Sequence, residues 1–175
     1  MKAWLDVMAK DIIETEAKRR HFVETGGPLF GYFCEEPDEL VIVAAFGPGP
    51  RAKHRPRSLV PDRAATELVI TDVHERSQGR YRYIGSWHTH PFGLARPSAI
   101  DSTTAGDISA QESVALEQPL LLIQATRPTP RMVRIGRLRA FQWNATSRSL
   151  DPVELLEVVD LVDRLLCSST EARPR

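Results

Sequence analysis

Short runs rich in valine, isoleucine and leucine constrain the fold of this chain more than any other feature of its sequence. Residues 40–46 read LVIVAAF, and similar runs follow later in the chain. Runs of this length, bounded by turn-forming residues, predict β-strands. The predicted strands are 29–33, 40–46, 81–91, 119–126 and 131–141. The first two are expected to form a hairpin, and residues 141–143 are expected to extend the last strand.

Helical patterns lie between and beside these strands. Apolar residues recur at spacings of three and four, with charged residues between them, and this period is typical of amphipathic helices. Helices and strands do not alternate as regular βαβ units, so the sequence predicts an α/β fold with a largely antiparallel or mixed sheet. The predicted helices cover about 5–20, Pro61 to Gly79, Ser98 to about Glu112, and 151–166 with Asp151 as N-cap.

The length of 175 residues suits one domain with its own hydrophobic core. We expect that domain to span residues 1–168 and the tail 169–175 to be disordered. Its oligomeric state is left open by the sequence.

Charge and cysteine content exclude several classes of protein. The 23 Lys and Arg residues balance the 23 Asp and Glu residues, so the chain has no general attraction to nucleic acid or to an anionic membrane. No segment approaches the roughly 20 apolar residues of a membrane span. Cys34 and Cys167 form no CxxC pair, which argues against a disulfide framework and against a thiolate zinc site. We therefore expect a cytoplasmic protein without a nucleic acid or membrane partner.

A candidate metal site follows from three residues. His88 and His90 are two positions apart on a predicted strand, so their side chains leave the same face and can converge on one ion. Asp101 follows shortly after, near the start of a predicted helix. Two nitrogens and one carboxylate leave a fourth tetrahedral position open for water, as in catalytic zinc sites. Trp87 points to the opposite face, where we expect it to pack.

Hydrolysis at such a site also needs a group that takes a proton from water and returns it to the leaving amine. The chain has no HExxH sequence; His74-Glu75 comes nearest but lacks the second histidine. The general base must therefore come from elsewhere in the chain.

The run WHTHPFGLARPSAID, residues 87–101, resembles the signature of the JAMM (MPN-type) zinc metalloprotease family, and ETGGPLFGYF, residues 24–33, resembles the family segment in which a glutamate precedes a glycine-rich strand. The resemblance implies one Zn²⁺ per chain held by His88, His90 and Asp101. It implies Glu24 as general base and Ser98 as a hydrogen-bond donor to the oxyanion. It also implies a cytidine-deaminase-like, MPN-type mixed sheet flanked by helices on both sides.

The stretch 47–62 and the tryptophan before the first histidine resemble the prokaryotic JAB-domain subgroup, which includes deconjugating peptidases of CBASS-type antiphage operons. This resemblance implies a zinc-dependent peptidase or isopeptidase. Its substrate would be a ubiquitin-like protein, or a protein conjugated in a ubiquitin-like way, cleaved after its C-terminus. A role in antiviral defence would follow, and the loop 47–60 would contact the substrate.

Other interpretations of the same residues stay open. The chain could be a catalytically silent MPN-type scaffold, or a relative of a DNA-repair branch, although it lacks that branch's basic balance. Ser98 is also an ordinary N-cap residue, and Glu24 could be an ordinary helix-end carboxylate. The basic loop 51–57 could be a solvated surface run. No site role is assigned to the remaining histidines, which are His21, His54 and His74.

Overall fold

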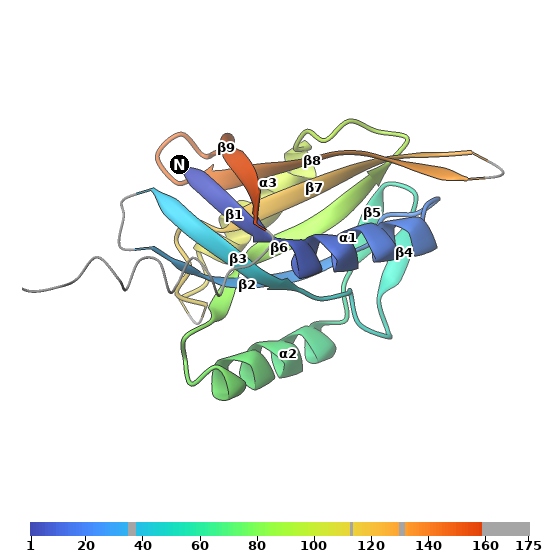
Figure 1. Cartoon of the computed structure of the whole chain (residues 1–175). Coiled ribbons are helices and arrows are strands. Elements are labelled where there is room, and N and C mark those ends of the chain that lie inside the picture. Colours follow the sequence, from blue (N-terminus) through green and yellow to red (C-terminus); the bar gives the residue numbers. More distant parts are fainter. Residues whose placement is uncertain (35–37, 113, 130–131, 159–175) are drawn as a thin grey trace, which may run out of the picture.

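A computed structural model of the chain describes residues 1–34, 38–112, 114–129 and 132–158. Within these residues seven strands form one closed, barrel-like sheet in the order β1-β3-β2-β6-β7-β8-β9 (Figure 1). Strand β1 is parallel to β3 and β9, β6 is parallel to β7, and the other neighbours are antiparallel. The bounds are β1 (Lys2–Asp6), β2 (Gly26–Phe33), β3 (Glu39–Ala45), β6 (Arg82–Pro91), β7 (Leu120–Pro128), β8 (Val133–Asn144) and β9 (Ser149–Val158).

Helices and one small hairpin complete the described structure. Helix α1 (Val7–Arg19) packs on the sheet through buried Ala9, Ile13 and Ala17. Helix α2 (Arg63–Arg76) stands at one side of the molecule, and α3 (Ala99–Ser109) lies behind β7 and β8 in Figure 1. Strands β4 (Lys53–Arg55) and β5 (Ser58–Val60) pair as a separate hairpin. None of the helices among the described residues combines the length and the apolar character that a bilayer crossing requires.

The core lies on both faces of the strands that carry the candidate site. One buried cluster includes Trp87, Leu122 and Ile42, together with α1. A second, smaller cluster joins Ile123 and Phe141 on the other face of β7 and β8. Because residues alternate between faces along a strand, β6 contributes Trp87 to the first cluster and turns its histidines to the second side.

Most of the predicted elements are confirmed. The hairpin of 29–33 and 40–46 is β2 and β3, the strand 81–91 is β6, and the two apolar runs that follow are β7 and β8. The helix expected after Ser98 begins there, with Ser98 as its N-cap. The predicted mixed sheet is confirmed, although its closure is not part of the prediction. The placement of helices on both sides of the sheet stays a prediction.

The helix predicted over 151–166 is wrong over its first half, because 149–158 forms β9. This strand pairs with β8 on one side and with β1 on the other, so hydrogen bonds to two neighbours outweigh the local helical period. The rest of that predicted helix, and the tail 169–175, lie outside the described residues.

The predicted helix 5–20 begins later than expected, at Val7. Residues Lys2–Asp6 form β1, which closes the sheet between β3 and β9. The Asp6 side chain accepts a hydrogen bond from the Met8 N–H and so caps the helix. Strand β1 therefore continues directly into helix α1, although the apolar residues over about 5–20 show a single helical spacing.

Candidate metal centre and active site

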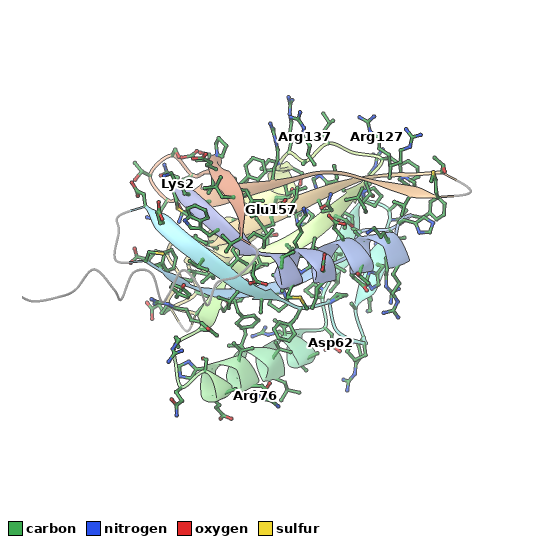
Figure 2. All side chains as sticks on the ribbon, in the orientation of Figure 1. Lys2, Asp62, Arg76, Arg127, Arg137 and Glu157 are labelled. Atoms are coloured by element: carbon green, nitrogen blue, oxygen red, sulfur yellow. The ribbon has the colours of Figure 1, made fainter. Side chains whose placement is uncertain are left out.

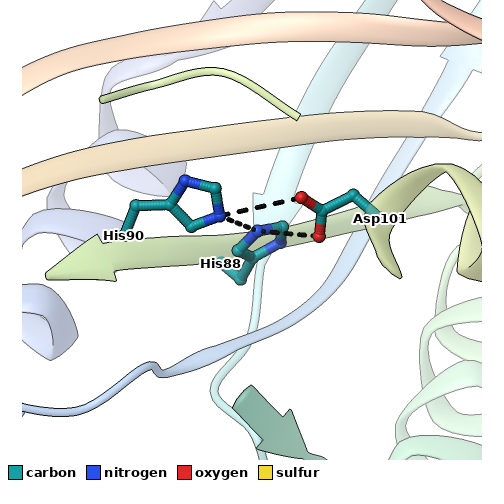
Figure 3. Close-up of side chains that lie close together, drawn as sticks. All are labelled: His88, His90 and Asp101. Carbon is teal, nitrogen blue, oxygen red and sulfur yellow. Dashed lines mark hydrogen bonds and ion pairs between the residues drawn. The ribbon is translucent and has the colours of Figure 1, made fainter. Parts of the chain in front are cut away.

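Strand β6 brings two imidazoles to the same point. The Nε2 atoms of His88 and His90 lie 2.9 Å apart, and the ring centroids are 4.8 Å apart (Figure 3). Gly26 of β2 is registered with His88, and a Cβ at Gly26 would meet the Trp87 carbonyl oxygen at 2.2 Å. The glycine-rich start of β2 therefore lets the two strands approach closely beside the histidines.

Helix α3 brings Asp101 to the histidines through its own N-terminal cap. The Ser98 N–H donates to Asp101 Oδ2 at 2.6 Å, and the Asp101 N–H donates to Ser98 Oγ at 3.3 Å. This reciprocal pair is a capping box. It holds the carboxylate with Oδ1 3.2 Å from His88 Nε2 and Oδ2 3.7 Å from His90 Nε2.

The protonation state of the imidazoles suits ligation. His90 Nδ1–H donates to the Leu94 carbonyl oxygen at 3.0 Å, which leaves a lone pair on Nε2 facing the site, as in many metal-binding histidines. Burial lowers the pKa of His88 to about 4; Asp101 opposes this shift and His90 adds to it. His88 is therefore neutral at physiological pH and can offer a lone pair as well.

These three side chains fit a metal ion. Their ligand atoms all lie within 4.8 Å of one another, and the side chains are 13–15 % exposed. Two donors bound to one tetrahedral zinc at about 2.0–2.1 Å are about 3.3–3.4 Å apart, and the observed separations of 2.9, 3.2 and 3.7 Å bracket that value. Two neutral imidazole nitrogens at 2.9 Å repel one another unless a cation or a proton lies between them, so the donor set suits a cation.

Glu24 lines the same cleft as the three candidate ligands. Burial, and to a smaller extent the negative charge of Asp101, raise the pKa of its carboxyl from 4.5 to about 7. The backbone of Glu24 is held on both sides by the β4–β5 hairpin, since its N–H donates to the Arg55 carbonyl at 2.8 Å and its carbonyl accepts from His54 Nδ1–H at 2.8 Å. A carboxyl whose pKa is near neutrality suits a proton-transfer role.

A buried polar pair fixes the strand of Glu24 beside the strand of the histidines. The Thr25 N–H donates to Thr89 Oγ1 at 3.0 Å, and the Thr89 N–H donates to the Thr25 carbonyl at 2.8 Å. Thr25 Oγ1 in turn donates to Glu16 of α1. Both threonines are buried, so these bonds form a rigid link directly behind the candidate base.

The site lies in a cleft of about 850 Å³ with a mostly apolar lining. Its walls come from the β4–β5 hairpin, from β6 and from α3, and Ser98 lies on the wall with Asp101. A mostly apolar cleft with a few converging polar groups is the usual form of a binding or active site.

The structure brings the five site residues that the sequence predicts into one cleft, which are Glu24, His88, His90, Ser98 and Asp101. The sequence analysis misses the residues that orient them. His54 is predicted to have no site role, yet it binds the Glu24 carbonyl. The Leu94 carbonyl and the Thr25–Thr89 pair are also missed, because backbone acceptors and buried threonines leave no signature in a sequence.

The sequence model described as prokaryotic homologs of the JAB domain matches residues 8–144 of this chain. The chain belongs to this family. It is 30 % identical over 127 residues to the probable metalloprotease y4qB of Sinorhizobium fredii, covering 71 % of this chain and 76 % of that protein. As a member of the JAB family with metalloprotease and isopeptidase relatives, the chain is a JAMM-type hydrolase.

Two further relatives are named CD-NTase/cGAS isopeptidase. The protein of Enterobacter hormaechei is 27 % identical over 109 residues, which cover 60 % of this chain and 57 % of that protein. The protein of Escherichia coli is 27 % identical over 115 residues, which cover 63 % of this chain and 72 % of that protein. The solution structure of protein DSY2949 from Desulfitobacterium hafniense shares the fold, with a TM-score of 0.60 and 18 % identity over 92 % of this chain and 96 % of that one.

Proposed function

We propose that this JAB-family protein is a zinc peptidase or isopeptidase that hydrolyses the bond after the C-terminus of a ubiquitin-like protein or of a protein conjugated in a ubiquitin-like way. The relatives named isopeptidase support a protein conjugate as substrate. A role in antiviral defence, in the cytoplasm, is part of this proposal and rests on the resemblance to the peptidases of CBASS-type operons.

The proposed metal ligands are His88, His90 and Asp101. When bound, the metal supplies a Lewis acid that polarises the scissile carbonyl and lowers the pKa of water to roughly 7. Zinc is the proposed ion because two imidazoles and one carboxylate, with one position left for water, are a usual catalytic zinc set.

Glu24 is the proposed proton carrier. Its carboxylate takes a proton from the attacking water and then gives it to the leaving amine nitrogen, which balances the hydrolysis. In the metal-free protein its pKa is raised to about 7, and a cation bound near Asp101 would favour the ionised form that accepts the proton. The hydrogen bonds to Arg55 and His54 hold its backbone in place.

Ser98 is the proposed oxyanion donor. Its Oγ accepts a hydrogen bond from the Asp101 N–H, so its own O–H proton is free to donate to the oxygen that gains charge as the carbonyl is attacked. A fixed donor of this kind is typically worth about 3–4 kcal/mol in the transition state.

The single observation that carries the proposal is the convergence of a two-histidine, one-carboxylate donor set and a glutamate with a raised pKa in one cleft. A second candidate function, a silent scaffold, needs no such glutamate. The intact donor set favours the enzyme over the scaffold.

The test combines metal content with cleavage of a panel of ubiquitin-like fusions and conjugates. We expect about one zinc per chain in the wild type and in Glu24→Ala, none in His88→Ala, and cleavage by the wild type alone. Arg76→Ala on α2, far from the cleft, is the matched control and should bind zinc and cleave normally. Absence of zinc from the wild type contradicts the metal site, whereas normal zinc binding without cleavage of any substrate in the panel supports the scaffold.

A further inference from the structure

The hairpin of β7 and β8 carries four exposed arginines: Arg127, Arg134, Arg137 and Arg139. The hairpin extends beyond the ends of its neighbouring strands (Figure 1), and Arg127 and Arg137 project from the same side of it (Figure 2). We call these four residues the arginine stripe. The positive and negative charges of the whole chain balance, so the arginine stripe is a local concentration of positive charge.

The arginine stripe has no counter-ion within the described residues. No ion pair or side-chain hydrogen bond joins any of its members to an acidic group there. Exposed cations on the helices differ, since Arg63 pairs with Glu67 at 2.8 Å and Arg76 pairs with Asp72 at 2.6 Å.

Two members of the stripe lie directly opposite one another. Arg127 and Arg134 are partners in the antiparallel register of β7 and β8. Like charges in this position destabilise a sheet, so the pair costs stability in the free protein. A bound anion between the two guanidinium groups would turn that cost into two charge-assisted contacts.

The stripe lies on the same face of the sheet as the candidate metal ligands. His88 is registered with Ile123 and His90 with Ala125 in the parallel pair of β6 and β7, and registered residues share a face. Arg127 follows Ala125 by two positions, so it is the next residue on that face. From strand spacing and rise, its Cα is about 8 Å from that of His90.

We propose that the arginine stripe binds an acidic segment of the protein substrate, adjacent to the scissile bond. This inference rests on the proposed function for its substrate, but binding itself does not require cleavage. An extended segment that leaves the cleft past His90 meets Arg127 and Arg134 within two or three residues, at the rise of about 3.3 Å per residue. Carboxylates suit these guanidinium groups because the planar fork binds them bidentately.

An acidic protein segment fits better than nucleic acid. The stripe is confined to one hairpin beside the cleft, whereas a nucleic acid site usually needs a basic excess over a whole face. The balanced charge of the chain provides no such excess.

The test measures binding of a fluorescein-labelled octaglutamate peptide to the full chain by fluorescence anisotropy at low salt. We expect Arg127→Gln/Arg134→Gln to weaken binding by about five-fold or more, because two charge-assisted contacts are lost. The control Arg63→Gln/Arg76→Gln removes the same charge from α2 and should leave binding within about two-fold. With cleavable substrates, glutamates placed next to the bond should lower KM for the wild type only, with kcat unchanged.

Several outcomes would overturn the proposal. Equal weakening in the two double variants would show a response to net charge alone. Dependence on Lys53 and Arg57 in place of Arg127 and Arg134 would assign the peptide to the β4–β5 hairpin. Tight, stripe-dependent binding of a 20-nucleotide single strand without octaglutamate binding would favour nucleic acid. Octaglutamate affinity that is insensitive to salt would exclude charge pairing even if a variant failed to fold.

Discussion

The two faces of β6 differ in how completely their side chains are satisfied. Trp87 and Thr89 point inward, are 1 % exposed, and have hydrogen-bond partners in the Phe46 carbonyl and the Thr25 N–H. His88 and His90 point to the cleft, where their Nε2 atoms face each other at 2.9 Å. One strand thus carries a completed core on one side and an incomplete donor set on the other.

Stability and chemistry therefore reside on opposite faces of β6. Groups that are fully bonded within the core contribute to folding, whereas the two imidazole Nε2 atoms of the cleft face converge on a point where a cation can bind. Substitutions on the cleft face of β6 should therefore lower activity with little effect on the free energy of unfolding. Substitutions on the inward face should lower the free energy of unfolding with little effect on the chemistry. The following predictions test that separation.

The largest effect is expected on the cleft face. His90→Ala removes one donor, and cleavage should fall by at least about a thousand-fold, because metal assistance contributes several kcal/mol to the transition state. The measurement is kcat/KM on a cleavable conjugate, together with urea unfolding of the metal-free protein. An unfolding midpoint close to that of the wild type would show that the cleft face of β6 contributes little to folding, and loss of the fold would contradict this.

Trp87→Ala tests the inward face. The substitution leaves a large cavity in the main core and an unpaired Phe46 carbonyl, so the free energy of unfolding should fall by about 3–5 kcal/mol. Trp87→Phe keeps most of the volume and loses the hydrogen bond, and should cost about 1 kcal/mol. Urea denaturation measures both, and zinc binding by the folded Trp87→Phe protein should remain near one per chain.

Two buried threonines allow matched substitutions that should change the free energy of unfolding less than Trp87→Ala does. Thr89→Val removes the acceptor of the Thr25 N–H and should cost about 1–3 kcal/mol, because a buried donor is left unpaired. Thr126 is also buried, but within the described residues its Oγ1 has no hydrogen-bond partner. Thr126→Val should therefore be neutral or slightly stabilising. Equal costs in the two variants, measured as unfolding free energies, would contradict the role of the Thr25–Thr89 link.

The last predictions concern the pH dependence of stability in the metal-free protein. Glu24 has a pKa raised from 4.5 to about 7, so its contribution is present below pH 4.5 and is lost as pH rises through 7. His88 has a pKa lowered from 6.5 to about 4, so its contribution is present above pH 6.5 and is lost as pH falls through 4.

Relative to Glu24→Gln, the wild type should therefore lose stability as pH rises from 4.5 to about 7. Relative to His88→Asn, it should lose stability between pH 6.5 and 4. Thermal unfolding midpoints across pH 4–8 measure both differences, and Trp87→Phe, which titrates nothing, should follow the wild-type pH profile. A flat difference curve for Glu24→Gln would contradict the raised pKa.

The sequence predicts which residues meet in the cleft better than it predicts the outline of the fold. His88, His90, Ser98 and Asp101 lie within fifteen positions of one another, so local geometry on a strand and a helix start is sufficient to bring them together. Strand β9 is mispredicted because its pairing with β1 joins residues about 150 positions apart, and no local period reports such a contact. The role of His54 is missed for the same reason, since it depends on a backbone carbonyl 30 residues away.

The carboxylate of Asp101 has two duties: it starts a helix and it faces the histidines. In evolution, replacing Asp101 would therefore remove a proposed metal ligand and one half of the N-terminal capping box of α3 at the same time. A lineage that abandons chemistry can replace either histidine at little cost to its architecture, whereas replacing the aspartate also loosens the beginning of α3. Descendants drifting toward a purely binding role are therefore expected to shed the histidines first and to retain the aspartate longest.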